Sequence, residues 1–234
     1  MKRSFMFICA AALLLTGCGA SADEASAQLF AMDTVMQLDA YGHQVKQAVS
    51  DAEETIQALE ARLSRTREDS LVSVLNQNGA AQDLSAAEQA LLSEALTFRD
   101  ATGGAFDITI APVMDAWGFT GDSYRVPAQD ELDALLENVN SDEIRLSGSS
   151  VTLGAGQAID LGGIAKGYTS DCVEAVFREN KIESGKISLG GNVFVLGGKP
   201  DGADWRVGIR DPQDENALAA VLTLRGAYAI TSGG

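Results

Sequence analysis

Helical and strand patterns are segregated along this chain instead of alternating. Residues 44–139 carry apolar side chains at spacings of three and four, the period of amphipathic helices, whereas residues 185–234 form short apolar runs punctuated by glycines. A doubly wound parallel sheet needs strands that alternate regularly with helices. The segregated order therefore predicts an α+β fold with a mostly antiparallel sheet packed by helices.

Capping and turn residues predict where individual elements begin and end. The longest helix is expected over 44–66, where one apolar stripe is formed by Val45, Val49, Ala52, Ile56, Leu59 and Leu63. A second helix over 83–104 opens with Ser85 and Glu88 in a capping-box pattern. Further helices are expected over 68–79, from Pro112, over 127–139 and over 166–181. Strands are expected at 29–42, 185–198, 204–212 and 217–234, with a hairpin and one more strand within 143–163.

The N-terminal segment has the form of a secretory signal. Lys2 and Arg3 precede an apolar run that is shorter than the roughly 20 residues needed to span a bilayer. The run ends in Leu-Thr-Gly-Cys, which resembles a bacterial lipobox with Cys18 as the lipidated residue; the alternative is an ordinary cleaved signal with a chance cysteine. We therefore expect a signal peptide at 1–17, a flexible tether at 18–27 and one domain at 28–234. This organisation predicts a protein anchored by lipid to the extracytoplasmic face of a bacterial membrane.

The charge and the rare residue types exclude several functional classes. A formal net charge of −16 disfavours nucleic-acid binding, which needs a basic surface. With His43 as the only histidine and no cysteine pair expected in the mature chain, a Cys/His metal site is excluded and a Ser-His-Asp triad is disfavoured. A hard cation such as Mg²⁺ with oxygen ligands stays possible. Cys172 lies in a helical pattern, which favours a buried packing role over a nucleophilic one.

Two glycine-containing segments are candidates for ligand binding. In 158–171, Asp160 and a Gly-Gly turn precede a predicted helix that carries Lys166; the spacing fails the Walker A pattern, but helix N-termini bind phosphate. In 103–110, two glycines precede Phe106, which can stack on a ring, and Asp107, which offers acceptor oxygens. Both segments also have purely structural interpretations. In 158–171, the Gly-Gly turn would only join a strand to a helix. In 103–110, Phe106 would be core and Asp107 would cap the next segment.

Seven stretches taken in order resemble the ApbE-type FAD:protein FMN transferases. They cover most of residues 28–234 and lie at 31–38, 63–76, 101–119, 158–171, 186–198, 205–212 and 229–234. The resemblance implies an ApbE-like fold and an Mg²⁺-dependent enzyme that uses FAD as its substrate. Such an enzyme moves FMN onto a threonine or serine hydroxyl of a target flavoprotein, forms a phosphoester bond and releases AMP. Hydrolysis of FAD to FMN and AMP, or flavin binding without catalysis, are the alternatives.

The resemblance also assigns roles to individual residues, but it does not identify which residues are catalytic. The positions that match FAD contacts in the family are Met32, Thr66, Ala105, Phe106, Asp107, Asp160 and Lys166. The main-chain carbonyl of Gly163 matches a ligand of the magnesium ion. Thr66 stands where the family usually has an aromatic ring, and Asp33 stands where it usually has glycine after the methionine.

Members of the family continue beyond the segment that matches 229–234. The resemblance implies that this continuation carries a His-x-x-Asp-Pro-x-x-Gly stretch and the acidic ligands of the magnesium ion. We therefore treat the domain at 28–234 as C-terminally incomplete, and we expect the 234-residue chain by itself to be poorly active and marginally stable.

Overall fold

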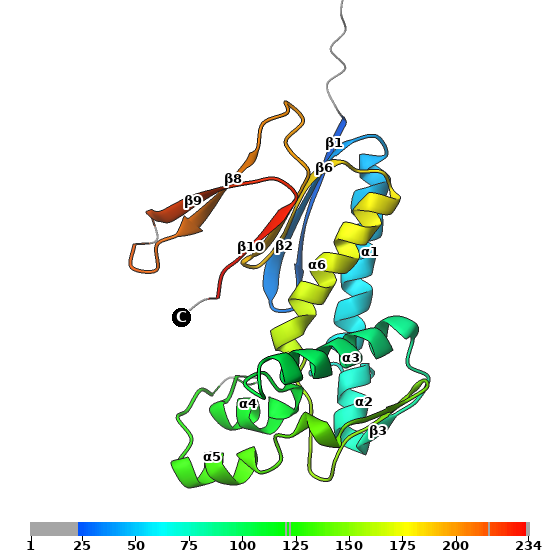
Figure 1. The fold of residues 1–234 in the computed structure, drawn as a ribbon, viewed down its shortest axis with the longest axis vertical. Coiled ribbons are helices and arrows are strands. Elements are labelled where there is room, and N and C mark those ends of the chain that lie inside the picture. The colour runs from blue at the N-terminus through cyan, green and yellow to red at the C-terminus, as the bar shows by residue number, and fades with distance from the viewer. Residues whose placement is uncertain (1–22, 120, 122, 215, 233–234) are drawn as a thin grey trace, which may run out of the picture.

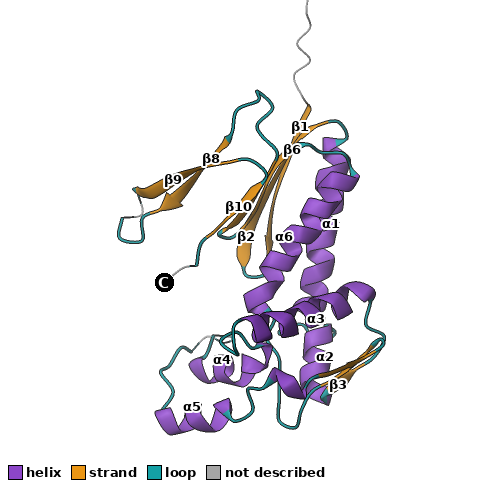
Figure 2. Cartoon of the chain, in the orientation of Figure 1, coloured by secondary structure: helices purple, strands orange, loops and turns teal. Residues whose placement is uncertain are grey.

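The upper part of the molecule is a sheet with two long helices on one face, and the lower part is mainly helical (Figures 1 and 2). The structure is a computed structural model, and it describes residues 23–119, 121, 123–214 and 216–232. The long helices α1 (Val45–Leu63) and α6 (Gly162–Glu179) lie side by side and run from the sheet into the lower part. This mixture of helices and an antiparallel sheet confirms the α+β prediction.

The main sheet has five antiparallel strands in the order β1-β2-β6-β7-β10. Their bounds are β1 Asp23–Ala31, β2 Thr34–Gly42, β6 Ser184–Leu189, β7 Asn192–Leu196 and β10 Ala227–Ile230. Alternate residues such as Met36, Leu38 and Ile187 are fully buried, because strand side chains alternate between faces and this face meets the helices. A separate two-stranded ribbon is formed by β8 (Trp205–Arg210) and β9 (Leu218–Leu224).

The lower part contains shorter elements that lie between α1 and α6 in the sequence. Its helices are α2 Leu71–Asn78, α3 Ala86–Ala101, η1 Ile108–Ile110, α4 Ala111–Trp117, α5 Gln129–Leu136 and η2 Ser141–Glu143. A small sheet has the order β3-β5-β4, with bounds β3 Ala80–Ala81, β4 Arg145–Ser147 and β5 Ser150–Thr152. Both interactions of the predicted capping box are present at the start of α3, between Ser85 and Glu88.

Two hydrophobic clusters stabilise the two parts. The upper cluster joins the sheet to α1 and α6 and includes Ile56 and Phe177, which are both fully buried. The lower cluster joins α2, α3 and the small sheet, and includes Leu63 of α1 and Ala165 of α6. Because α1 and α6 contribute to both clusters, these helices connect the two parts of the molecule.

Three sequence predictions are corrected by the structure. The single strand expected at 29–42 is a hairpin, since Met32 and Asp33 adopt positive φ values of 49° and 58° and turn the chain between β1 and β2. Residues 23–27, expected in the flexible tether, belong to β1 and pair with β2, so the folded region begins at Asp23 and not at residue 28. The strand expected after the hairpin within 143–163 is absent, because Asn76 and Ile108 take the main-chain hydrogen bonds of residues 159–160.

The predictions for the N-terminus lie outside the described residues. These are the signal peptide at 1–17, lipidation of Cys18 and the first part of the tether. Within the residues that the structure does describe, no helix combines the length and the apolar character needed to cross a membrane.

Candidate functional site

The first two turns of α6 carry two predicted site residues, Gly163 and Lys166, which lie about 60° apart around the helix because they are three residues apart. Thr169 follows three residues later; it is fully buried and lies about 120° around the helix from Gly163. The side chain of Asp160 accepts a hydrogen bond of 2.6 Å from the main-chain N–H of Gly162. This contact places a carboxylate at the positive end of the helix dipole, where negative charge is stabilised.

The ring of Phe106 lies against Gly163, so two predicted positions are brought together. A Cβ atom added to Gly163 would lie 3.0 Å from Cε2 of Phe106, and only glycine leaves this space open. Phe106 is half-buried, packs on the lower cluster and meets Phe98 edge-on at 6.3 Å between ring centroids. The main chain of Asp160 donates a 2.7 Å hydrogen bond to the carbonyl of Ile108, which joins the two glycine-containing segments.

Met32 reaches α6 from the β1–β2 turn. The hydroxyl of Thr169 lies 3.7 Å from the Met32 sulfur, and the main-chain N–H of Met32 donates to Glu60 of α1 at 2.9 Å. The turn therefore holds Met32 beside α6 at Thr169, about one turn beyond Lys166.

Asp160 is paired with a cation that the sequence analysis did not single out. Nη1 of Arg65 lies 2.9 Å from Oδ2 of Asp160, and Nη2 lies 2.8 Å from Oδ1 and 2.9 Å from Oδ2 of Asp115. The side chains of Arg65 and Asp160 are each 14% exposed, whereas that of Asp115 is 52% exposed. In the sequence, Arg65 differs from other arginines only by its position directly before the predicted site residue Thr66. That position, in a chain with a net charge of −16, was the one signal that could have identified Arg65.

The carboxylate of Asp107 is occupied by hydrogen bonds within the protein. It accepts from the main-chain N–H and hydroxyl of Thr109 and from the main-chain N–H and hydroxyl of Ser141. Burial raises the pKa of Asp107, but the hydrogen bonds from Ser141 and Thr109 outweigh this effect and leave the pKa below its ordinary value. The structure thus supports the capping interpretation of this side chain. The FAD contact of Asp107 that the resemblance implies stays a prediction.

Ala105 and Thr66 are exposed and less tightly connected to this surface. Ala105 follows the glycines that end α3, directly before Phe106. The hydroxyl of Thr66 lies 3.1 Å from that of Ser64 in the loop after α1. Thr66 therefore contributes a small polar group next to Arg65, where the family usually places a ring.

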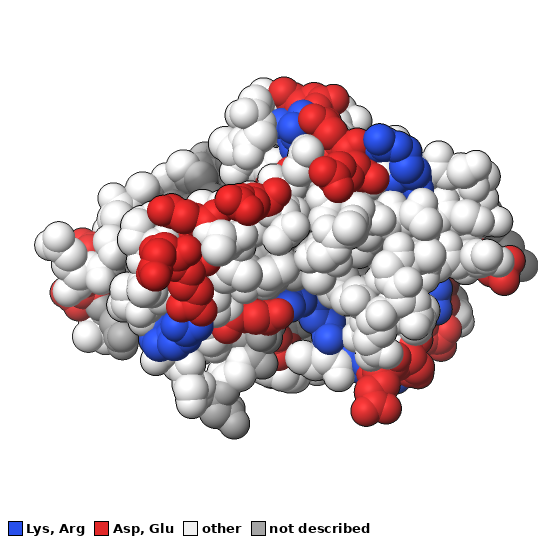
Figure 3. Space-filling model, turned by 90° about the horizontal axis from the view of Figure 1, so that it is seen from below, with Lys and Arg blue, Asp and Glu red and all other residues white. Residues whose placement is uncertain are grey.

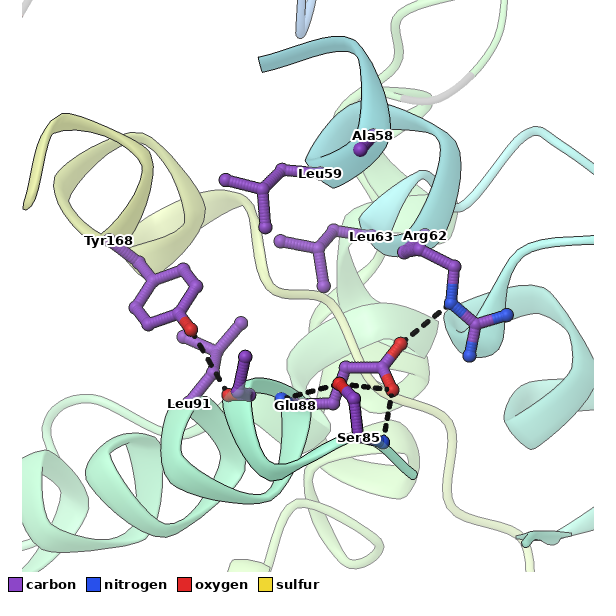
Figure 4. Close-up of a pocket in the computed structure, with 9 residues that line it drawn as sticks. Ala58, Leu59, Arg62, Leu63, Ser85, Glu88, Leu91 and Tyr168 are labelled. Carbon is purple, nitrogen blue, oxygen red and sulfur yellow. Dashed lines mark hydrogen bonds and ion pairs between the residues drawn. The ribbon is translucent and has the colours of Figure 1, made fainter. Parts of the chain in front are cut away.

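Two pockets lie elsewhere and include none of the predicted FAD contacts. One has a volume of about 120 Å³ and lies between α1, α3 and α6, where the Tyr168 hydroxyl donates to the Ala87 carbonyl and Arg62 pairs with Glu88 (Figure 4). Tyr168 projects about 200° around α6 from Lys166, so this pocket opens on a different side of the helix. The other, of about 430 Å³, lies where β2 meets α1 and is lined by residues such as Tyr41, His43 and Ser184.

The described residues do not by themselves form the magnesium site that the resemblance implies. Among them, no group of three or more His, Cys, Asp or Glu side chains is arranged to hold a metal ion. The predicted ligand at Gly163 is a single carbonyl oxygen, whereas Mg²⁺ prefers six oxygen ligands. No step through a metal ion is therefore derived for these residues.

The surface charge makes the few cations near α6 important for an anionic ligand. Acidic side chains cover more of the face seen from below than basic ones do (Figure 3). On such a surface, a diphosphate needs local positive charge to bind. Lys166 and the N-terminus of α6 supply that charge at this site, and Arg65 offsets part of the negative charge of Asp115 and Asp160 beside them.

Known proteins resemble this chain over most of its length. Residues 32–234 match the sequence profile of the ApbE family. The FAD:protein FMN transferase of Treponema pallidum is 31% identical over 210 residues, which cover 81% of this chain and 58% of that protein. The FAD:protein FMN transferase of Vibrio cholerae is 26% identical over 242 residues, covering 99% of this chain and 72% of that protein.

Solved structures share the fold. The ApbE protein of Thermotoga maritima superposes with a TM-score of 0.81 at 25% identity, covering 88% of this chain and 69% of that one. The flavin transferase ApbE of Vibrio cholerae gives a TM-score of 0.72 at 25% identity, covering 82% and 65%. This chain therefore spans well under the full length of several relatives, with 58% for the T. pallidum protein. The predicted ApbE-like fold and family resemblance are both confirmed, and the chain belongs to the ApbE family.

Proposed function

We propose that this protein is an FAD:protein FMN transferase. The observation that carries the proposal is the family match over residues 32–234, combined with the placement of Met32, Phe106, Asp160, Gly163 and Lys166 at the first turns of α6. These positions come from three separate segments of the chain: the β1–β2 turn, the segment before η1 and residues 158–171. Their convergence on a helix N-terminus supports a site for a dinucleotide with a diphosphate.

The proposed reaction is the transfer of FMN from FAD to a threonine or serine hydroxyl of a target flavoprotein. The acceptor oxygen forms a bond to the FMN phosphorus, the bridging P–O bond breaks, and AMP leaves as the hydroxyl proton is released. The residues described here bind and orient: Lys166 and the first turn of α6 offset negative charge, and Phe106 offers a ring beside them. The half-buried Cys172 takes no part, because burial raises the pKa of its thiol and disfavours the thiolate.

Magnesium and the membrane are parts of the same proposal. Mg²⁺ would supply charge neutralisation at the diphosphate, with Gly163 as one ligand. The Leu-Thr-Gly-Cys motif supports lipidation of Cys18 and a location on the extracytoplasmic face of a bacterial membrane. Palmitate labelling of the wild type and of Cys18→Ala in a bacterial host tests this part, and equal labelling would contradict it.

Binding and turnover are tested separately. Binding of FAD to the purified chain is measured by quenching of flavin fluorescence for the wild type, Asp160→Asn and Lys166→Met. We expect each variant to weaken binding about tenfold, the loss typical of one charge-assisted contact. Lys46→Met removes an exposed lysine on α1 and serves as the matched control. Unchanged affinity in both site variants would contradict the proposed site.

Turnover is followed by AMP release and by the mass of an added FMN-acceptor domain, with Mg²⁺ and with chelator. A covalent FMN adduct that forms together with AMP and is lost with chelator supports the transferase. AMP and free FMN without an adduct would indicate FAD hydrolysis. FAD binding with neither product would indicate a flavin-binding protein.

A further inference from the structure

Arg65 connects the candidate site to two other segments, α4 and α2. Its guanidinium bridges Asp160, before α6, and Asp115 of α4, and its main-chain carbonyl accepts a 2.9 Å hydrogen bond from the Ser73 hydroxyl of α2. The pair with Asp160 is the more buried of the two, with 14% of each side chain exposed. A largely buried ion pair with one fixed partner defines side-chain orientation more strongly than a surface pair does.

Asp160 has two contacts that fix its carboxylate in one position. Oδ1 accepts from the N–H of Gly162 at 2.6 Å, and Oδ2 accepts from Arg65 at 2.9 Å. Removal of Arg65 would leave the largely buried carboxylate of Asp160 without its cation, in a region that already holds the carboxylate of Asp115. Its preferred orientation would then be lost, because the remaining single hydrogen bond does not define the rotamer.

Charge gives a second reason for a role of Arg65 in binding. The guanidinium offsets two carboxylates beside the α6 N-terminus, so a ligand diphosphate meets less negative charge there. The Nε atom of Arg65 is buried and has no hydrogen-bond partner among the described residues, so the two Nη atoms carry the ion-pair contacts. Lysine has a single ammonium group and cannot reproduce this two-sided bridge.

We propose that Arg65 is a positioning residue for the dinucleotide site, which orients Asp160 and offsets part of the negative charge of Asp115 and Asp160 so that FAD can bind. This inference rests on the proposed function. It differs from the FAD contacts that the family resemblance implies, because Arg65 acts through Asp160.

The test is a double-mutant cycle on FAD affinity in the 234-residue chain. We expect Arg65→Met and Asp160→Asn each to weaken FAD binding about tenfold, and the double variant to lie within about threefold of the weaker single variant. Arg65→Lys should recover part of the loss, and Asp115→Asn should change affinity less than threefold or so, because it leaves the Arg65–Asp160 pair in place.

Arg62→Met is the matched control for loss of an arginine ion pair. Arg62 lies at the end of α1 and pairs with Glu88, away from Asp160, with 48% of its side chain exposed. We expect it to leave FAD affinity unchanged. Unfolding midpoints of all variants show whether each is folded, and Arg65→Lys keeps the test informative if Arg65→Met is unstable.

The possible outcomes separate this inference from the proposed function. Weak FAD binding in Asp160→Asn with normal binding in Arg65→Met would overturn the role of Arg65 and leave the proposed function standing. Additive losses in the double variant would also overturn it, since Arg65 would then act independently of Asp160. Normal FAD binding in Asp160→Asn alone would overturn the inference, because Arg65 is proposed to act through Asp160. Normal FAD binding in both Asp160→Asn and Lys166→Met, or no FAD binding by the wild type, would overturn the proposed function as well.

Discussion

Asp107 links two segments that are 34 positions apart through one side chain. Both oxygens accept hydrogen bonds, with Ser141 at the start of η2 and Thr109 within η1 as the donors. The side chain is only 7% exposed. Because its donors lie within the protein, this carboxylate fixes the position of the Phe106–Asp107 segment below Gly163.

Asp107→Asn should destabilise the fold. The amide group turns one acceptor into a donor that faces other donors, and such mismatched buried groups cost about 1–3 kcal/mol. The effect depends on pH, because the pKa of Asp107 in the folded protein is below its ordinary value of 3.8. Its stabilising contribution is therefore complete above about pH 4 and decreases as the pH falls through the folded-state pKa.

Urea unfolding of the wild type and Asp107→Asn at a series of pH values measures this contribution. The difference in unfolding free energy should be largest near neutral pH and should shrink toward pH 3. Asp83→Asn, which changes an exposed aspartate in the loop before α3, is the control. A difference that stays constant down to pH 3 would show that the charge of Asp107 has no part in it.

Single residues were partly predictable from the sequence. Asp160 and Phe106 were predicted because each lies near a pair of glycines and close to a predicted helix. Glycines let a ligand approach the main chain closely, and a helix N-terminus binds phosphate. Arg65 was not found, since nothing local shows that its partners would be Asp115 and Asp160, 50 and 95 positions away. Long-range ion pairs depend on how elements pack, and an unaligned sequence contains no direct record of that packing.

At the scale of elements, the β1–β2 turn places Met32 next to α6. Met32 and Asp33 both have positive φ, and the register pairs Ala31 with Thr34, so this is a two-residue hairpin turn. Such turns usually contain Asn-Gly or Asp-Gly. The absence of that signal explains why the sequence predicted one strand, and the small, polar residues of 23–27 explain why the start of β1 resembled a tether.

A β-branched residue at Asp33 should destabilise this turn. Asp33 is exposed with a φ of 58°, a conformation that aspartate and asparagine tolerate and valine does not. Asp33→Val should lower the unfolding free energy by about 1–2 kcal/mol, while Asp33→Asn should stay within about 0.5 kcal/mol of the wild type. Equal stability of the two variants in urea unfolding would contradict the positive-φ turn.

The helices were the most predictable elements. The apolar stripe of α1 and the capping box of α3 are local sequence patterns, and both are present in the folded structure as predicted. The strand expected near Ile159 was wrong because its main-chain groups bond to the Asn76 side chain instead of to another strand. Local β-propensity describes a segment, whereas pairing requires a partner strand that the sequence alone did not locate.

At the scale of the whole molecule, α1 and α6 span the upper and lower hydrophobic clusters. α1 contributes Ile56 above and Leu63 below, and α6 contributes Phe177 above and Ala165 below. If α1 and α6 separated from the upper cluster, they would be displaced from the lower cluster as well. Unfolding of one part would therefore expose apolar surface in the other part. We therefore expect the two parts to unfold together as one cooperative unit.

The two tryptophans of the chain report on the two parts separately. Trp117 lies on α4 in the lower part, and Trp205 lies on β8 beside Tyr41 of β2, at 6.1 Å between ring centroids. Trp117→Phe and Trp205→Phe each leave one reporter. Their fluorescence transitions in urea should have the same midpoint as the circular dichroism of the same variant.

Phe177→Ala extends this test by perturbing the upper cluster alone. Phe177 is fully buried against the sheet, and its removal should cost about 3–5 kcal/mol through lost burial and a cavity. If the molecule is one cooperative unit, the variant lowers the midpoint seen by Trp117 as much as that seen by Trp205, although Trp117 lies in the other part. A transition at Trp205 that shifts while the one at Trp117 stays in place would show instead that the lower part, with the α6 N-terminus and the candidate site, folds independently of the sheet.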